Sequence, residues 1–227
     1  MSTVNNYYQL KATIDSKIIG RSELPLTVEI KDKTFSSQSR EYMLNVDKYF
    51  EDKDVILKHF PHNIIGKMYQ RKKDPIDIML SMPSYMSIEF IVSKKVKDIL
   101  DRLNIEPSEY QTVELAIEGH EQPYYFLFIP MLKNKEYVDY QKSIFHSSRL
   151  DHTTTFGTYD EYLLARNNGY RVKTLYVSNE LSDRDIISLQ AAGPFFSERI
   201  VDAFKENQVI GYDIIKGGDF KVDLKFS

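Results

Sequence analysis

The first part of the chain contains short runs in which strand-forming residues partly alternate with polar ones. "YYQLKATI" (7–14) and "LPLTVEI" (24–30) are two such runs, and "GRSE" and "KDK" supply turn residues beside them. Residues 1 to about 45 are therefore expected to be rich in β-strand. Further on, "DVILKHF" predicts a short helix that ends before Pro61, because the residue before a proline is kept out of the helical region.

From Ser87 onward the pattern is sharper. "IEFIV" predicts a buried strand, and Ser93 follows it at a position suited to a helix cap. The next apolar residues fall at helical spacing and predict one amphipathic helix: Val96, Ile99, Leu100 and Leu103. "QTVELAIEG" then alternates as a half-buried strand, and "GHEQP" turns the chain into "YYFLFI", which predicts a hairpin.

The C-terminal stretch has the same order of elements. "PFF" resembles a strand end, Ser197 a cap, and Ile200, Ala203 and Phe204 a helical stripe. "GYDIIK" and "FKVDLKFS", separated by "GGD", predict a second hairpin. Aligning Ser93 with Ser197 superposes the apolar positions of the two helices. This order indicates either an internal duplication of a strand–helix–hairpin unit or two independent copies of a common arrangement.

Two capping boxes lie between these units. "TYDE" (158–161) predicts a helix that stops near Asn168-Gly169, and "SDRD" (182–185) predicts a short helix over "RDIISLQAA". Residues 132–157 have little periodicity and are expected to form a long loop, which in a compact domain is usually functional or mobile.

Together these elements predict an α+β fold in which mixed, largely antiparallel sheets are flanked by short helices. A weakly marked subdomain boundary is expected near Pro83. It would separate a β-rich N-terminal subdomain (1–82) from an α+β region (83–227), although the two could form one compact domain.

Composition narrows the classes of function. The chain has 227 residues, a formal net charge of −3 and 42% hydrophobic residues, which is typical of a globular protein without a polyanionic partner. It has no cysteine, which excludes disulfides, thiolate metal sites and cysteine nucleophiles. The N-terminal residues do not resemble a signal peptide, and the longest apolar runs are too short to span a membrane. A cytoplasmic location without membrane attachment is therefore expected.

The residues that could serve as catalytic groups all have simpler structural interpretations. Ser93 and Ser197 lack the flanking glycines of a nucleophile elbow or a phosphate loop, so both are interpreted as caps. His59 and His62 have no third ligand nearby in sequence, and "SSRLDHTTT" gathers serine, aspartate and histidine only within one loop-like stretch. Acidic pairs lie where helix starts favour negative charge. We therefore expect no catalytic residue, metal site or cofactor.

The repeated unit carries a resemblance to a known family. "FIVSKKVKDILDRLNI" with its hairpin, and "DIISLQAAGPFFSERIVDAFKENQVIGYDI", resemble the two motif blocks of a bacterial immunity-protein family of polymorphic toxin systems, formerly catalogued as a domain of unknown function. "YVDYQKS" and "YYQL" resemble its middle and N-terminal segments. The matching positions are hydrophobic and capping residues, and the family provides no catalytic residues to transfer.

The resemblance implies a non-enzymatic protein that neutralises a cognate toxin domain by occluding it. Interfaces of this kind use aromatic anchors and charged residues. The irregular segment 132–157 contains both types, and its expected partner-binding residues are Tyr137, Asp139, Tyr140 and Asp151. The alternative is a hydrolase or nuclease-like enzyme whose site is assembled from dispersed Asp, Glu and His residues. A weaker alternative is a scaffold that uses an exposed strand edge. The toxin and the oligomeric state are left open.

Overall fold

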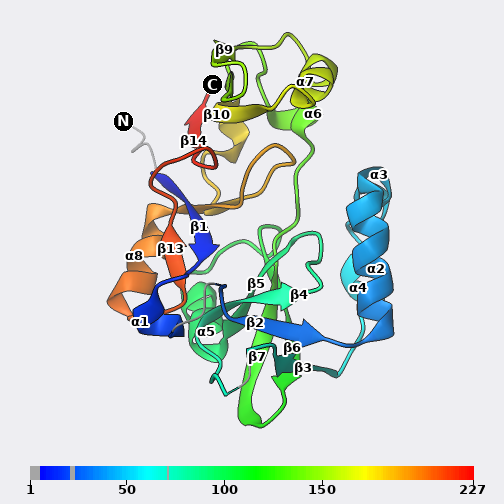
Figure 1. Ribbon diagram of the computed structural model, residues 1–227, viewed down its shortest axis with the longest axis vertical. Coiled ribbons are helices and arrows are strands. Elements are labelled where there is room, and N and C mark those ends of the chain that lie inside the picture. Colours follow the sequence, from blue (N-terminus) through cyan, green and yellow to red (C-terminus); the bar gives the residue numbers. More distant parts are fainter. Residues whose placement is uncertain (1–5, 21–23, 71) are drawn as a thin grey trace. The chain divides into compact units, whose positions relative to one another are not determined.

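The computed structural model describes residues 6–20, 24–70 and 72–227 (Figure 1). The chain divides into two compact units, neither of them continuous in sequence. The barrel unit consists of Lys11–Pro130 and Ile200–Asp213, and the sheet unit consists of Met1–Leu10, Met131–Arg199 and Ile214–Ser227. The expected boundary near Pro83 stays a prediction. In the barrel unit, the strands on either side of Pro83 pair with each other.

The barrel unit is built around six strands that close on themselves. In chain order, its elements are α1 (Ser16–Ile19), β2 (Thr27–Ile30), α2 (Lys33–Leu44), α3 (Val46–Asp52), α4 (Ile56–His59), β3 (Ile64–Met68), β4 (Ile78–Met82), β5 (Ile88–Ser93), α5 (Lys94–Arg102), β6 (Gln111–Ile117) and β7 (His120–Phe128). The barrel order is β2-β3-β6-β7-β5-β4, and β4 returns to β2 in parallel register. Closure leaves no strand of the barrel with an unpaired edge.

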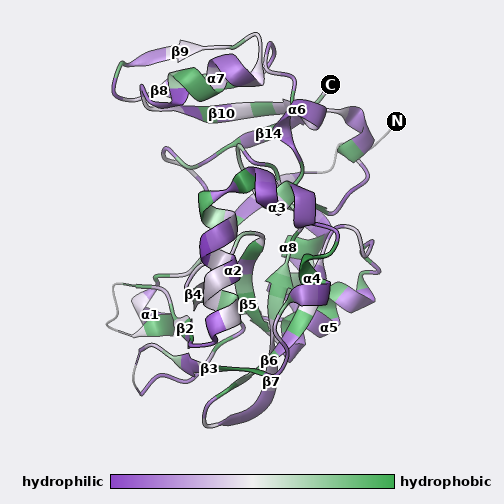
Figure 2. Ribbon diagram, turned by 90° about the vertical axis from the view of Figure 1, so that its right-hand side faces the viewer, coloured by the Kyte–Doolittle hydropathy of each residue, from purple (hydrophilic) through white to green (hydrophobic). Residues whose placement is uncertain are grey.

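The interior of the barrel is tightly packed. Along β3, buried and exposed residues alternate, and Gly66 occupies the middle inward position. A Cβ atom built on Gly66 would lie 2.3 Å from Val28 Cγ1 and 3.1 Å from Ile30 Cδ1, so only a glycine fits between these side chains. The rings of Phe35 and Phe126 stack with centroids 5.3 Å apart. Figure 2 shows the hydrophobic colouring concentrated on strands such as β5, whereas α3 is mainly hydrophilic.

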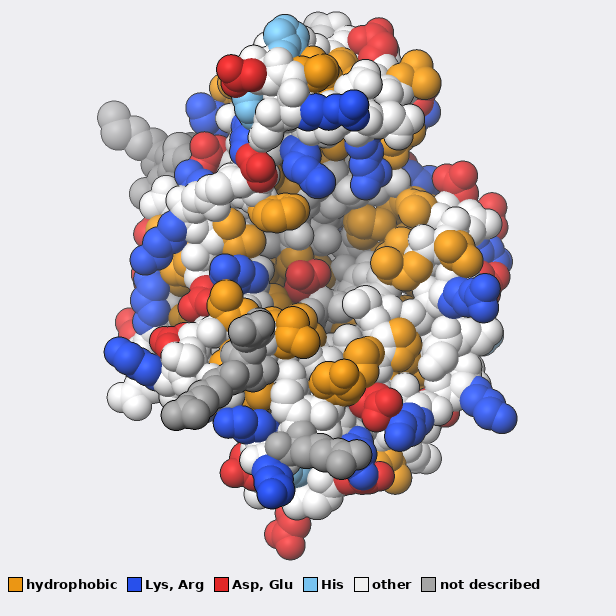
Figure 3. Space-filling model, in the orientation of Figure 1, with side chains coloured by type: hydrophobic (Ala, Val, Ile, Leu, Met, Phe, Trp, Pro, Cys, Tyr) orange, Lys and Arg blue, Asp and Glu red, His pale blue; other side chains and the backbone are white. Residues whose placement is uncertain are grey.

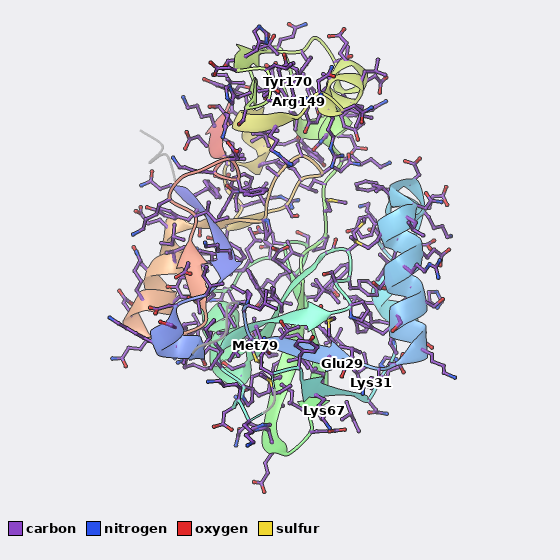
Figure 4. All side chains as sticks on the ribbon, in the orientation of Figure 1. Glu29, Lys31, Lys67, Met79, Arg149 and Tyr170 are labelled. Atoms are coloured by element: carbon purple, nitrogen blue, oxygen red, sulfur yellow. The ribbon has the colours of Figure 1, made fainter. Side chains whose placement is uncertain are left out.

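Charges of both signs cover the outside of the barrel (Figure 3). Glu29, Lys31 and Lys67, labelled in Figure 4, belong to the adjoining strands β2 and β3 or their ends. Lys67 donates a hydrogen bond of 2.8 Å to Glu118, and this bond holds the pKa of Glu118 below its usual value. Both partners are well exposed, so the pair adds little to stability.

Helix α2 corrects the expectation that residues 1 to about 45 are mainly β-strand. Asp32 caps it by accepting a hydrogen bond of 2.8 Å from the Phe35 amide. Phe35, Ser39 and Tyr42 are buried, which places one residue per turn on a single face of the helix. This spacing of four and three residues is a helical signal that the polar neighbours obscure. The short helix predicted before Pro61 is confirmed as α4.

Both serine-led helices are confirmed. Helix α5 starts after Ser93, whose hydroxyl accepts from the Val96 amide, and its buried residues are Val96, Ile99 and Leu100. Helix α8 (Glu198–Glu206) follows Ser197 and buries Ile200, Val201 and Phe204. Ala203, expected in this stripe, is half-buried.

Only one of the two predicted hairpins forms. Strands β6 and β7 pair in antiparallel fashion, as predicted. At the C-terminus, β13 (Tyr212–Ile214) and β14 (Asp223–Phe226) belong to different sheets, and β14 pairs in parallel with β10. The prediction of a second hairpin is therefore wrong, because long-range pairing outweighs the local turn signal of Gly217-Gly218. The repeated unit is a strand, a serine and a helix.

The sheet unit contains most of the second half of the chain. Its elements, some of which continue into the barrel unit, are β1 (Tyr7–Ala12), α6 (Asn134–Tyr137), β8 (Ile144–Ser147), β9 (His152–Thr154), α7 (Tyr159–Arg166), β10 (Tyr170–Val177), the 3-10 helix η1 (Asn179–Leu181), β11 (Ile186–Ile187), β12 (Phe195–Ser197), α8, β13 and β14. One sheet has the order β14-β10-β8-β9, and the other has the order β11-β12-β1-β13. The apolar core of the unit includes Phe145, Leu175 and Phe195, which are fully buried.

Two sequence expectations in this unit are wrong. Residues 132–157 are not one long loop, since they contain α6, β8 and β9. The "SDRD" box does not open a helix, because Asp185 leads into strand β11 and bonds to Ser197 instead. The other box is confirmed: Thr158 caps α7, and Gly169 follows the helix with φ +82°. The fold class, mixed α+β with short helices, is confirmed. Over the described ranges, no helix is both long and apolar enough to cross a bilayer.

Candidate functional site

A pocket of about 420 Å³ opens on the surface of the sheet unit. Two segments line it, and both belong to this unit: Lys135, Val138, Asp139, Tyr140 and Gln141 on one side, and Gly157, Thr158, Tyr159 and Asp160 on the other. The first segment contains the end of α6, and the second contains the start of α7. The sequence-predicted residues Asp139 and Tyr140 therefore lie at a concave surface beside the first turn of a helix.

Ion pairs neutralise much of the charge around this pocket. Lys135 Nζ lies 3.0 Å from Asp160 Oδ1 and 5.5 Å from the centroid of the Tyr159 ring. Lys142 Nζ lies 3.2 Å from Asp139, and the Lys142 amide donates to the same carboxylate over 3.1 Å. Partial burial alone would raise the pKa of Asp139, but the bonds from Lys142 hold it below its usual value. The pocket suits a polar surface of mixed charge.

The four predicted partner-binding residues occupy different environments. Tyr140 is buried, and its ring stacks on Phe145 with centroids 5.9 Å apart. Burial raises the pKa of the Tyr140 hydroxyl. Tyr137 and Asp139 are half-buried, whereas Asp151 is exposed between β8 and β9 with φ +46°. The structure brings Asp139 and Tyr140 to the pocket and leaves Asp151 outside its lining. Their role in partner binding stays a prediction.

Sequence reasoning missed Lys135, Tyr159 and Asp160 as pocket residues. The capping box located the start of α7, but no local signal places that start beside residues 135–141. The contact arises because Tyr140 and Tyr162 share one aromatic cluster with Phe145. Such a cluster joins segments far apart in the chain and leaves no periodic pattern in the sequence.

Ser147 of β8 and His152 of β9 are cross-strand partners, but their side chains form hydrogen bonds with different groups. The buried Ser147 hydroxyl donates to the Asn168 carbonyl over 2.8 Å. His152 Nδ1 lies 2.7 Å from the hydroxyl of Tyr170, labelled in Figure 4. Within the part of the chain that the structure describes, no three His, Asp or Glu side chains are arranged to hold a metal ion.

Comparison with known proteins assigns the chain to a family. No curated protein matches its sequence. The profile of the Immunity protein family (Imm11) matches residues 6–218, which is nearly the whole chain and includes both serine-led helices. The resemblance seen in the two motif blocks is thereby confirmed, and the chain belongs to the Immunity protein family (Imm11).

Proposed function

We propose that this chain binds a cognate toxin domain and neutralises it by occlusion, without catalysis of its own. The observation that carries the proposal is the family match over residues 6–218. An immunity protein implies a toxin as partner. In the described residues, the serine, histidine and carboxylate groups considered for catalysis are engaged in structural bonds or dispersed, which agrees with a binding role.

Occlusion by a folded protein requires a surface that is rigid before the partner arrives, because ordering loops on binding weakens affinity. The sheet unit offers such a surface. Its core residues Phe145, Leu175 and Phe195 are fully buried, and its strands hold the exposed side chains at fixed spacing. The sequence-predicted residues Tyr137, Asp139, Tyr140 and Asp151 also belong to this unit.

The test is co-expression of this chain with the C-terminal domain of a multidomain toxin identified by its position beside this gene. We expect the chain to restore growth of cells that produce the C-terminal toxin domain, and to co-purify with that domain as a stoichiometric complex. A catalytic antidote would instead protect cells at substoichiometric levels and without a stable complex. Failure both to protect and to co-purify would refute the proposal.

A further inference from the structure

The sheet β14-β10-β8-β9 has two chemically different faces. Val172, Leu175 and Val177 of β10 point into the core of the sheet unit, together with Phe145 of β8. The residues between them point the other way, and Figure 2 shows β10 changing between hydrophilic and hydrophobic colours along its length. A strand that alternates in this manner has one face on the core and one face toward solvent.

Strand register shows which residues share the outward face. Arg171 of β10 lies opposite His146 of β8, and His146 lies opposite Thr153 of β9. Beyond the register shift after Val172, Tyr176 of β10 lies opposite Lys225 of β14. Residues opposite one another on paired strands project to the same side. The outward face therefore carries a row of basic and aromatic side chains.

Two cations on this face lie over aromatic rings. The Arg171 guanidinium is 5.4 Å from the centroid of Phe220, and Lys225 Nζ is 5.6 Å from the centroid of Tyr176. Phe220 is 69% exposed, although a phenylalanine normally avoids water. Exposed aromatic and arginine side chains are the groups that dominate binding energy at protein interfaces.

The charge balance of the face is positive. Its two carboxylates are already paired: Asp219 with Lys173 at 3.2 Å, and Asp223 with Lys221 at 2.8 Å. Neither Arg171 nor Lys225 forms a salt bridge with any carboxylate in the described residues. Two positive charges are thus left in excess.

We propose that this outward face, centred on Arg171, Tyr176, Phe220 and Lys225, is the surface that recognises the toxin domain, through an acidic patch on that domain. The proposal rests on the proposed function and specifies the chemistry of the partner. Charge complementarity favours an acidic protein surface. A nucleic acid is a poorer match, because the chain carries a net charge of −3 and this face has only two unpaired cations.

The experiment measures the affinity of purified toxin domain for the full chain and its variants. Arg171→Glu with Lys225→Glu reverses both unpaired charges and is expected to weaken binding by about tenfold or more. The neutral pair Arg171→Gln with Lys225→Gln should weaken it less, in the same direction. Phe220→Ala alters no charge and should also weaken binding, because it removes the exposed anchor. Thermal unfolding checks that each variant is folded.

A matched control is Arg40→Glu with Lys58→Glu in the barrel unit. Both residues are exposed, and the substitutions change the net charge by the same amount. This control should bind as the unaltered chain does. Raising the salt concentration should weaken the unaltered complex more than the complex of the reversed variant.

The outcomes separate the two proposals. If the unaltered chain binds the toxin domain and all the face variants bind equally well, the face is not the interface, although the function stands. If the control loses as much affinity as the reversed variant, long-range charge alone is responsible and the face proposal is refuted. Binding of a single-stranded oligonucleotide at this face, in preference to the toxin domain, also refutes it. Failure of the unaltered chain to bind or protect removes the proposed function itself.

Discussion

The Ser197 hydroxyl donates a hydrogen bond of 2.6 Å to the Asp185 carboxylate, and the Ser197 amide donates one of 2.7 Å to the Asp185 carbonyl. Ser93 makes the same two bonds to Asp77, over 2.8 and 2.9 Å. In both cases the aspartate precedes one strand of an antiparallel pair, and the serine ends the other. The serines thus join a strand pair to a helix.

The correspondence between these two units continues beyond the serines. Arg199 and Lys95, at the same offset from their serines, form salt bridges with Asp185 and Asp77 respectively. Asn104 and Gln208, again at equal offsets, end their helices with φ +50° and +51°. A common arrangement that arose twice independently would not be expected to share all of these details. We infer that the strand–serine–helix units derive from an internal duplication.

Removing either side of the hydrogen bond between Ser197 and Asp185 should lower the stability of the fold. We expect Ser197→Ala to cost about 1 kcal/mol, and Asp185→Asn about 1.5–3 kcal/mol, because hydrogen bonds to a charged group are the stronger ones. Chemical denaturation measures both losses. Asp183→Asn, at an exposed aspartate two positions earlier, is the control and should leave stability unchanged. Toxin binding should survive Ser197→Ala; its loss in a folded variant would contradict the structural role.

The contribution of Asp185 to the stability of the folded state should depend on pH. Burial alone would raise the pKa of Asp185, but the hydrogen bonds from Arg199 and Ser197 hold it below its usual value. The ionised form therefore stabilises the folded state above the unfolded pKa of about 3.9, and this contribution is lost as the pH falls through the lower, folded pKa. The stability difference between the unaltered chain and Asp185→Asn should be constant near neutral pH and shrink below about pH 4. If this stability difference instead grew below about pH 4, the folded pKa of Asp185 would have to lie above its unfolded value, and the prediction would be contradicted.

Gly66→Ala should destabilise the barrel by about 1–3 kcal/mol, because the added methyl group would collide with Val28 inside a closed sheet. Gly217→Ala is the matched control, since a Cβ there meets nothing within 4 Å. Thermal or chemical unfolding compares the two variants. Equal stability would mean that the barrel can open enough to admit a methyl group.

Two substitutions at Tyr140 distinguish a structural role of this residue from a role in partner binding. Tyr140→Ala should cost about 3–5 kcal/mol, because it removes a ring from the core of the sheet unit. Tyr140→Phe keeps that ring and should bind the toxin domain with unchanged affinity. A large loss of affinity in folded Tyr140→Phe would instead support the prediction that the Tyr140 hydroxyl contacts the partner.

Much of the fold could be predicted from local sequence. The stripe of Val96, Ile99 and Leu100 identified α5, and the Thr158 box identified α7. Two of the failures, the second hairpin and the helix after "SDRD", occurred where distant pairing overrides a local signal. Asp185 resembles a helix start, but its carboxylate is taken by Ser197 and Arg199, so its own segment pairs as strand β11.

The surface was harder to predict than the core. An interface residue is recognised by its neighbours in space, and Arg171 and Phe220 come together only when the segment before β14 folds against β10. Tyr140 was expected to be an anchor because the family resemblance implies an interface and aromatic residues are common anchors, but residue type does not distinguish a buried ring from an exposed one. The predicted segment 132–157 does supply β8, whose His146 belongs to the outward face.

The parallel pairing of β14 with β10 has a consequence for synthesis. All six barrel strands lie within residues 27–128, so they leave the ribosome before the segments that complete the outward face. β14, in contrast, spans Asp223–Phe226 and follows the last barrel strand by about a hundred residues. At about 5–20 residues per second, this stretch takes roughly 5–20 s to translate. A newly made molecule therefore acquires Lys225, and with it a complete outward face, several seconds after its barrel strands.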